Sequence, residues 1–353
     1  MRPGTRNRRA VLAGALLILC FPFLTLGGIR LYLAFHPKAR FGFTEGPPRT
    51  LEIPARTAAR EVAARLEAEG IIPNQWLFLA LATLRGTTDT LKAGEYQFTA
   101  DMGVLDVLVA MEEGRVVLHR VTIPEGATSR EIGALLHQEG LADRERFLAL
   151  VSDPVVASRV DPEATTLEGY LFPDTYYFTK GLREEAIIEK MVARFFRAFP
   201  LEEEIRARSL GRSRYEIVTL ASIVEREAVT NEEKPLIAAV FHNRLKRKML
   251  LQADPTVLYG RGKPVSSRIT YADLKSARNT YNTYIHPGLP PGPIANPGDS
   301  SLRAVLYPAD VGYLYFVSKN DGTHHFSKSF AEHHRAVRRY QLNNHAGRRA
   351  AGG

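Results

Sequence analysis

The chain of 353 residues has almost no cysteine, because Cys20 is the single one. One thiol cannot form an intramolecular disulfide, and it cannot supply the several thiolates of a structural zinc site. Cys20 also lies inside a long apolar run, so the remainder of the chain has no thiol nucleophile. That remainder is therefore compatible with an oxidising compartment outside the cytoplasm.

Several signals of other protein classes are also missing. The sequence contains no Gly-rich phosphate loop and no Gly-x-Ser-x-Gly elbow, so nucleotide and serine-hydrolase chemistry lack support. It has no stacked-aromatic nucleic-acid signature, and we expect no nucleic-acid partner. The histidine pairs His324-His325 and His333-His334 are adjacent residues whose side chains diverge on a strand or helix. We therefore expect no metal site, and nothing indicates a cofactor.

Positive charge is concentrated near the two ends of the chain. The formal net charge is +9, whereas 45% hydrophobic and 24% charged residues are ordinary globular values. Four arginines precede residue 10, and a second cluster comprises Arg335, Arg338, Arg339, Arg348 and Arg349. Such a surface would attract anionic lipid or an acidic polymer, although a solvated basic tail is an equally good interpretation.

An uncharged run, AVLAGALLILCFPFLTLGGI, follows the first arginines. Its length is enough for a helix to cross the hydrocarbon core of a membrane. It is longer than a signal-peptide core, and no small-x-small cleavage site precedes Arg30. We predict an uncleaved transmembrane helix over residues 10–30. The positive-inside bias then places residues 1–9 in the cytoplasm as a short tail. The chain after the transmembrane helix lies outside the cytoplasmic membrane.

The remainder predicts an α+β protein that begins after a linker, residues 31–48. LEIPARTAAREVAARLEAEGI from Leu51 and VTIPEGATSREIGALLHQEGL from Val121 form an internal repeat: a strand ending in Ile-Pro, a capped helix and a Gly stop. With a strand at 91–99, a helix at 104–114 and a strand at 116–123, we predict one small α+β module over 49–155. A mixed α+β catalytic domain, 160–345, and a tail, 346–353, follow.

The sequence ASIVEREAVT, residues 221–230, contains two glutamates and overlaps the end of a helix predicted over 215–228. Helical periodicity places Glu227 on the apolar stripe of Ile217, Leu220, Ile223 and Val224, and turns Glu225 away from it. Burial raises the pKa of a carboxyl group, so Glu227 is the candidate general acid. A structural ion pair of Glu227, for instance with Arg244, is the alternative, and Glu225 fits a solvated face or a supporting role.

Polar and aromatic residues after this helix are suited to binding sugars. The candidates for substrate binding are Asn243, Gln252, Thr256, Tyr281, Asn282, Thr283 and Tyr284. The long loop 279–298 is rich in proline, which indicates an ordered wall. We expect Asp254 to cap a helix before Pro255. Further helices are predicted at about 182–199 and 232–246, then a hairpin turning at 320–322 and a helix over 330–342.

Six motifs, in this order, resemble those of the YceG/MltG family of endolytic murein transglycosylases: LEGYLFPDTYYF, ASIVERE, FHNRL, LQADPTVLYG, YNTY with GLPPGPIANPG, and YLYFVSKNDGTHHFS. The resemblance covers nearly the whole chain, including the membrane anchor and a LysM-like module. It implies cleavage of the β-1,4 bond between N-acetylmuramic acid and N-acetylglucosamine in nascent peptidoglycan. The products would carry 1,6-anhydro ends, and strand length would be limited.

In this family the catalytic residue is a glutamate of the segment matching ASIVERE, which contains both Glu225 and Glu227. Helical geometry favours Glu227 as the acid that protonates the leaving oxygen and then accepts the C6-hydroxyl proton. The tethered hydroxyl replaces the second carboxylate of ordinary glycosidases. Tyr281, Asn282 and Gln252 would orient the saccharide. The family and the tether also imply coupling to peptidoglycan synthases.

Two other functions are compatible with the sequence. A hydrolytic muramidase would use Asp254 or Glu225 as a base for water, and a non-catalytic glycan-binding scaffold would leave Glu227 structural. Some relatives have been labelled aminodeoxychorismate lyases, but that chemistry needs a pyridoxal-phosphate lysine and a phosphate cup, and the sequence indicates neither.

Overall fold

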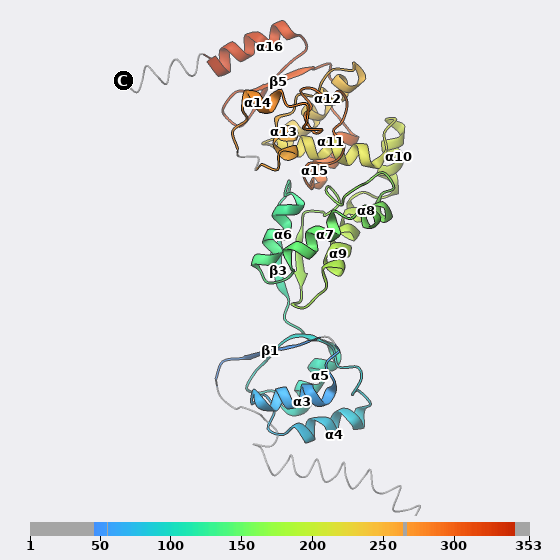
Figure 1. Ribbon diagram of the computed structural model, residues 1–353, viewed down its shortest axis with the longest axis vertical. Coiled ribbons are helices and arrows are strands. Elements are labelled where there is room, and N and C mark those ends of the chain that lie inside the picture. Colours follow the sequence, from blue (N-terminus) through green and yellow to red (C-terminus); the bar gives the residue numbers. More distant parts are fainter. Residues whose placement is uncertain (1–45, 55, 264–266, 343–353) are drawn as a thin grey trace, which may run out of the picture. The chain divides into compact units, whose positions relative to one another are not determined.

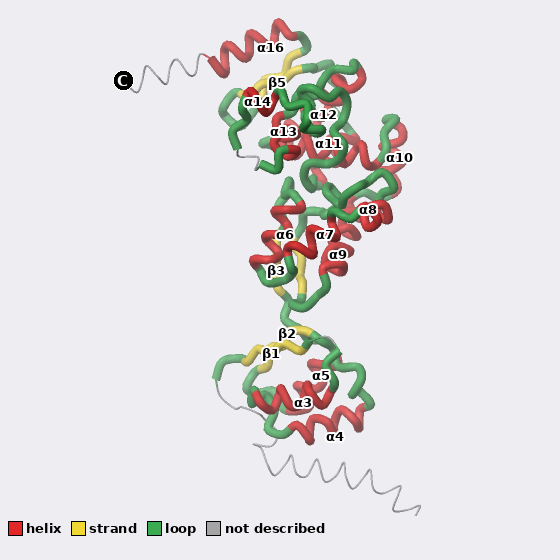
Figure 2. The backbone as a smooth tube through the Cα atoms, viewed as in Figure 1, coloured by secondary structure: helices red, strands yellow, loops and turns green. Residues whose placement is uncertain are grey.

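The computed structural model describes residues 46–54, 56–263 and 267–342 (Figure 1). The predicted cytoplasmic tail, transmembrane helix and C-terminal tail lie outside the described residues, as does most of the linker. No helix within the described part is long and apolar enough to cross a membrane. Helices dominate this part, and its strands form three two-stranded sheets, which confirms the α+β class (Figure 2).

The chain divides into two compact units. Unit 1 runs to His119 and includes Thr179–Gly181, whereas unit 2 comprises Arg120–Phe178 and the chain from Leu182 onward. The two copies of the repeat therefore lie in different units, whereas the sequence grouped them in one module. The reason is the burial of their helices: Val62 and Leu66 of the first copy join one core, and Ile132 and Leu136 of the second join another.

The described part of unit 1 contains an antiparallel pair of strands, in which Leu51 lies opposite Tyr96, and three helices. Its elements are β1 (Arg49–Ile53), α3 (Ala59–Ala68), α4 (Gln75–Arg85), β2 (Gly94–Phe98) and α5 (Val104–Glu113). The strand and the helix predicted near 91–114 are thus confirmed. The first repeat helix ends before Gly70, whose φ of 63° is left-handed, but the residue at its N-cap, Ala58, provides no side-chain cap.

The first part of unit 2 contains the second repeat copy. Its elements are β3 (His119–Thr122), α6 (Ser129–Gln138), α7 (Arg144–Val151), α8 (Pro154–Val160), β4 (Thr175–Phe178), α9 (Glu184–Ala198) and α10 (Leu201–Ser209). Here the predicted cap exists, because Thr128 and Glu131 form a capping box at the start of α6. β3 pairs with β4, so the aromatic segment after residue 166 completes a sheet begun by the repeat.

The rest of unit 2 is built around α11 (Arg214–Glu227), which packs against α12, α13 and α15 (Figure 1). The elements after α11 are η1 (Asn231–Glu233), α12 (Lys234–Lys246), α13 (Asp254–Gly260), α14 (Tyr271–Leu274), α15 (Asp299–Leu306), β5 (Tyr315–Ser318), β6 (His324–Ser327), α16 (Phe330–Val337) and the π-helical segment η2 (Arg338–Leu342). The predicted helices and hairpin are confirmed, and left-handed Asn320 and Gly322 lie in the hairpin turn.

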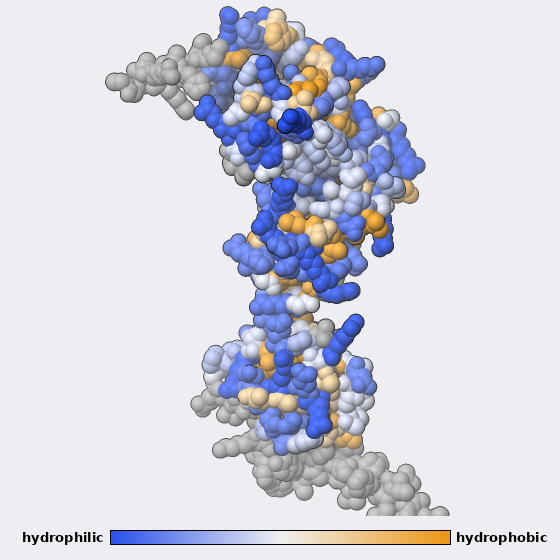
Figure 3. All heavy atoms as spheres, viewed as in Figure 1, coloured by the Kyte–Doolittle hydropathy of each residue, from blue (hydrophilic) through white to orange (hydrophobic). Residues whose placement is uncertain are grey.

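The apolar stripe of α11 is buried in the core of unit 2. Ile217, Leu220, Ile223 and Val224 are each at most 1% exposed. Hydrophilic residues cover much of the visible face of both units, with apolar side chains in scattered patches (Figure 3). Glu227, at the end of this stripe, is partly buried.

Candidate active site at the end of helix α11

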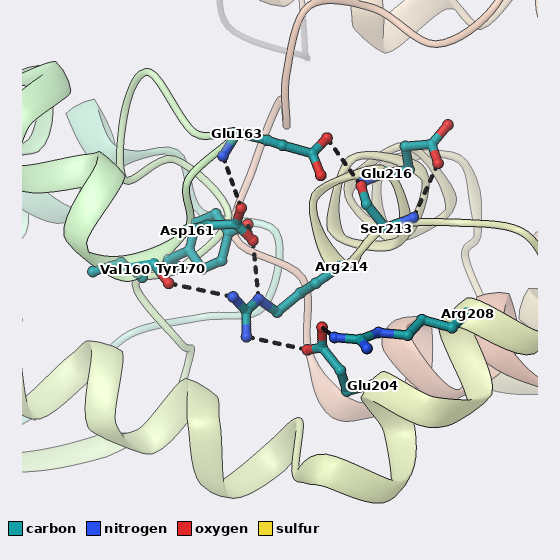
Figure 4. A network of polar contacts seen from close by, with 9 residues as sticks. All are labelled: Val160, Asp161, Glu163, Tyr170, Glu204, Arg208, Ser213, Arg214 and Glu216. Carbon is teal, nitrogen blue, oxygen red and sulfur yellow. Dashed lines mark hydrogen bonds and ion pairs between the residues drawn. The ribbon is translucent and has the colours of Figure 1, made fainter.

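The first turn of α11 is fixed by a partly buried polar network (Figure 4). Ser213 and Glu216 form a capping box. The Arg214 Nε donates to Asp161 Oδ2 at 2.9 Å, and its Nη1 donates to Glu204 Oε2 at 3.2 Å. Because Arg214 also lies over the ring of Phe196 at 5.2 Å, the helix starts from a point anchored to two other helices.

The middle of α11 holds the proline-rich loop in place. Ser222 accepts a hydrogen bond from the Ile294 amide at 3.0 Å. Gly169 has a φ of 91°, and a Cβ there would lie 2.7 Å from side-chain atoms of both Val218 and Pro293. The Gly in LEGY is thus required both by backbone conformation and by the close packing of loop and helix.

Glu225 lies in an ion pair that is nearly closed to water. Its Oε1 is 3.0 Å from Lys234 Nζ, and the two side chains are 8% and 4% exposed. Its Oε2 accepts the amide hydrogen of Gly298 at 2.9 Å, and Lys234 also donates to Ser300 Oγ at 2.8 Å. The solvated-face interpretation of Glu225 is therefore wrong. Both carboxylate oxygens are occupied by partners from α12 and the proline-rich loop.

Glu227, the last residue of α11, faces a different environment. It lines a pocket of about 270 Å³ together with Arg244, Leu251, Gln252, Asp254, Tyr284, Phe316 and His333. Of the residues selected from the sequence, the structure brings Glu227, Gln252 and Tyr284 together in this pocket. The two glutamates of ASIVERE point to separate surroundings, as their helical spacing predicts.

Burial raises the pKa of Glu227 to about 8, and the nearby negative charge of Asp254 acts in the same direction. The charge of Arg244 and a backbone interaction with Asp254 oppose this shift. In the described residues Arg244 donates to the carbonyls of Leu250, Leu251 and Leu314 instead of forming an ion pair with Glu227. A carboxyl group with this pKa is mostly protonated at neutral pH and can act as a general acid.

The pocket walls include a residue in an unfavourable conformation. Gln252 has a φ of 51°, a left-handed value that is uncommon for a residue with a side chain, and its amide donates to Thr283 O at 3.1 Å. Tyr284 donates its hydroxyl to Asp254 Oδ1 at 2.5 Å. The N-cap of α13 is Ala253, not Asp254, so the predicted cap is wrong and the Asp254 carboxylate lines the pocket instead.

The other predicted sugar-binding residues do not line this pocket and hold the surrounding loops. Asn243 donates to the carbonyls of Val311 and Tyr313, and Asn282 donates to three backbone carbonyls of residues 273–276. Thr256 and Thr283 are buried and share a hydrogen bond of 2.9 Å. Tyr281 packs on Tyr259, with ring centroids 5.0 Å apart.

Sequence patterns alone did not indicate Phe316 and His333 as pocket residues, and they indicated Arg244 only as an ion-pair partner of Glu227. The pocket takes Phe316 from β5 and His333 from α16, more than sixty residues beyond α12 in the chain. The pair His333-His334 is a visible sequence signal, but adjacent histidines on a helix diverge and so indicate no shared site. Only the packing of α16 on the hairpin places one member of the pair in the pocket.

An α+β fold with one desolvated carboxyl group facing a polar pocket defines a site for general acid chemistry. The YceG-like family matches residues 51–339, and the chain belongs to this family. It is 32% identical over 309 residues to the endolytic murein transglycosylase of Bacillus subtilis, covering 82% of this chain and 84% of that protein.

The chain is also similar to two further proteins. The endolytic murein transglycosylase of Streptococcus pneumoniae D39 is 31% identical over 320 residues, which are 82% of this chain and 57% of that longer protein. The crystal structure of a protein described as YceG-like from Listeria monocytogenes superposes with a TM-score of 0.57 at 35% identity. The match covers 83% of this chain and all of that one.

Proposed function

We propose that this protein is an endolytic lytic transglycosylase that cleaves the β-1,4 bond between N-acetylmuramic acid and N-acetylglucosamine in nascent peptidoglycan. The observation that carries the proposal is Glu227, a carboxyl group with a pKa of about 8 that faces a pocket rich in hydrogen-bonding groups. The names of the relatives from Bacillus and Streptococcus support the same activity. The products would carry 1,6-anhydro ends, and the glycan strands would be shortened.

The reaction needs one acid and one internal nucleophile. Glu227 gives its proton to the glycosidic oxygen as the bond from this oxygen to C1 of N-acetylmuramic acid breaks. The C6 hydroxyl oxygen of the same sugar bonds to C1, and its proton passes to a base in the pocket. Because this hydroxyl is tethered to the reacting sugar, its effective concentration is high and no water needs to be positioned. Gln252 and Tyr284 line the same pocket and would orient the saccharide.

A hydrolytic muramidase is the second candidate, because Asp254 lines the same pocket as Glu227. In that reaction Asp254 would activate a water molecule, as in glycosidases with two carboxyl groups. Mass spectrometry of digested glycan strands separates the two reactions. The transglycosylase product is lighter by one water and has no reducing end, whereas the muramidase product has one.

The assignment of the acid is tested with Glu227→Gln, which keeps the shape of the side chain and removes its proton chemistry. We expect this variant to bind glycan strands and to release no products. Glu232→Gln is the matched control, because Glu232 is an exposed carboxylate of η1 that does not line the pocket. Full cleavage by Glu227→Gln would reject the assignment. Lack of turnover by the unmodified protein on isolated strands would favour the scaffold alternative.

The location and partners form part of the same proposal. The uncharged run before Arg30 and the arginines that precede it support a single-pass anchor in the cytoplasmic membrane, with the enzyme on the outer side. The order β1, α3, α4, β2 supports a LysM-like assignment for unit 1. An anchored enzyme would act where peptidoglycan synthases release new strands. Fractionation of the full chain and of a form lacking residues 1–45 tests the anchor.

A further inference from the structure

His333 places a second acid–base group in the pocket of Glu227. It lies on α16, which packs against both strands of the C-terminal hairpin. Its imidazole stacks on the ring of Tyr315, with centroids 5.2 Å apart and an angle of 22° between the planes. The ring is therefore held in one orientation at the pocket wall, as a group that must meet a substrate atom needs to be.

The imidazole has unused hydrogen-bonding capacity. Its Nδ1 is buried and has no hydrogen-bond partner in the described part of the chain. An unpaired buried nitrogen is unfavourable, and such groups in folded proteins often have a functional role. The histidines of the hairpin differ from it: His324 Nδ1 pairs with Glu233 at 2.7 Å, and His325 packs near the ring of Tyr340.

The charges around His333 keep it neutral. Burial lowers its pKa, and the positive charge of Arg244 lowers it further. The acidic groups that line the same pocket are Glu227 and Asp254, and Glu227 is itself mostly uncharged at neutral pH. A protonated carboxyl group and a neutral imidazole then face one cavity. Enzymes that run acid and base chemistry together use pairs whose environments separate them in this way.

We propose that His333 is the catalytic base, which takes the C6-hydroxyl proton of N-acetylmuramic acid while Glu227 protonates the leaving oxygen. The inference rests on the proposed transglycosylase function. The bond from C1 to the glycosidic oxygen breaks with its electron pair on that oxygen, and the bond from O6 to C1 forms. The hydroxyl proton ends on the imidazole and the Glu227 proton on the released sugar. Solvent then exchanges one proton with each residue and restores both.

Two other groups are less suited to this step. Glu227 can accept a proton only after it has given up its own, so it cannot assist ring closure from the start. Asp254 already accepts the hydroxyl of Tyr284 through Oδ1. A neutral imidazole has a lone pair available throughout the reaction, so bond breaking and ring closure can proceed together.

The test compares three variants of the full chain in detergent, with uncrosslinked glycan strands as substrate. His333→Asn keeps a hydrogen-bonding amide near the position of Nδ1 without basicity, and His333→Ala removes the side chain. We expect both to lower kcat by about 10²- to 10⁴-fold with KM changed far less. Free imidazole should restore part of the activity of His333→Ala. His334→Asn is the matched control, because His334 is exposed on the same helix and lies outside the pocket.

Three results would overturn the role of His333: His333→Asn retains most of the wild-type kcat, the loss appears in KM alone, or imidazole fails to restore His333→Ala. Thermal melting of each variant shows whether the fold is intact. If His333→Ala does not fold, His333→Asn alone decides. A reducing-end product from the unmodified protein would reject the transglycosylase function instead, so the two failures are distinguishable.

Discussion

Glu225 Oε1 and Lys234 Nζ lie 3.0 Å apart in an ion pair almost closed to solvent, only two residues before the carboxyl group that faces the pocket. The pair joins the last turn of α11 to the first turn of α12. Gly298 and Ser300 extend it to the loop before α15 and to α15 itself. This relationship gives the two glutamates of one motif different surroundings, because Glu225 lies in a buried ion pair and Glu227 lines the pocket.

Removal of one partner of this pair should destabilise the protein strongly. We expect Glu225→Gln to lower the free energy of unfolding by about 3 kcal/mol, because the buried Lys234 then keeps only the half-exposed Glu125 carboxylate, 3.8 Å away, as a counter-charge. The double variant Glu225→Gln with Lys234→Met should recover most of this loss and cleave glycan. Thermal melting and product release measure both effects. A double variant that is folded and inactive would identify Glu225 as the acid.

Glu227 should make stability depend on pH. Below its ordinary pKa of 4.5 the carboxyl group is protonated in the folded and unfolded chains alike. Between 4.5 and about 8 the unfolded chain ionises first, so this group makes stability fall as pH rises. Glu227→Gln removes that loss, and we expect its melting temperature to exceed that of the wild type by about 2–6 °C at pH 8 and by little at pH 4.5. Equal differences at both pH values would contradict the raised pKa.

Asp254 should set part of the pH range of activity. Burial is the main cause of the raised pKa of Glu227, and the charge of Asp254 adds to it. Asp254→Asn removes that charge, so Glu227 should lose its proton earlier and the alkaline limb of kcat/KM should move down by about one pH unit. Tyr284→Phe is the control, since it removes the hydrogen bond to Asp254 and leaves the charge. An unmoved limb in Asp254→Asn would contradict the coupling.

We expect the Gln252 side chain to contribute to glycan binding, although the backbone of Gln252 is held in a strained conformation. We expect Gln252→Ala to raise KM by about 3- to 10-fold through a lost hydrogen bond, with a small change in kcat. Gln252→Gly should show the same KM but be more stable than the alanine variant by about 1 kcal/mol, because glycine adopts a φ of 51° without cost. An unchanged KM in both variants would show that the side chain does not contact the glycan.

Helical periodicity predicted much of the site because it depends on local geometry alone. The stripe from Ile217 to Val224 fixed which way Glu227 faces, and the spacing of two residues turned Glu225 elsewhere. The roles of loop residues were harder to predict from the sequence. A side-chain amide such as that of Asn282 can hydrogen-bond to a sugar, but here it donates to three backbone carbonyls. Which of the two occurs depends on contacts between segments far apart in the sequence.

The boundary between the two units could not be predicted from the sequence, for a similar reason. A repeat shows that two segments fold alike, but it does not show which core each of them joins. Val121 of the second copy packs with residues of the C-terminal part, and Ile53 of the first copy packs with α3 to α5. His333 shows the same limit of local patterns, because its place in the pocket depends on the fold of the C-terminal hairpin.

Arg244 binds the carbonyls of Leu250 and Leu251 on one side and of Leu314 on the other, with its guanidinium 5.3 Å from the centre of the Tyr315 ring. Arg244 thereby holds these segments of the pocket wall together in the absence of a glycan. Such preorganisation means that little of the binding energy is spent on ordering the walls. We therefore expect a glycan strand to bind between these walls without a large rearrangement of the residues that Arg244 holds.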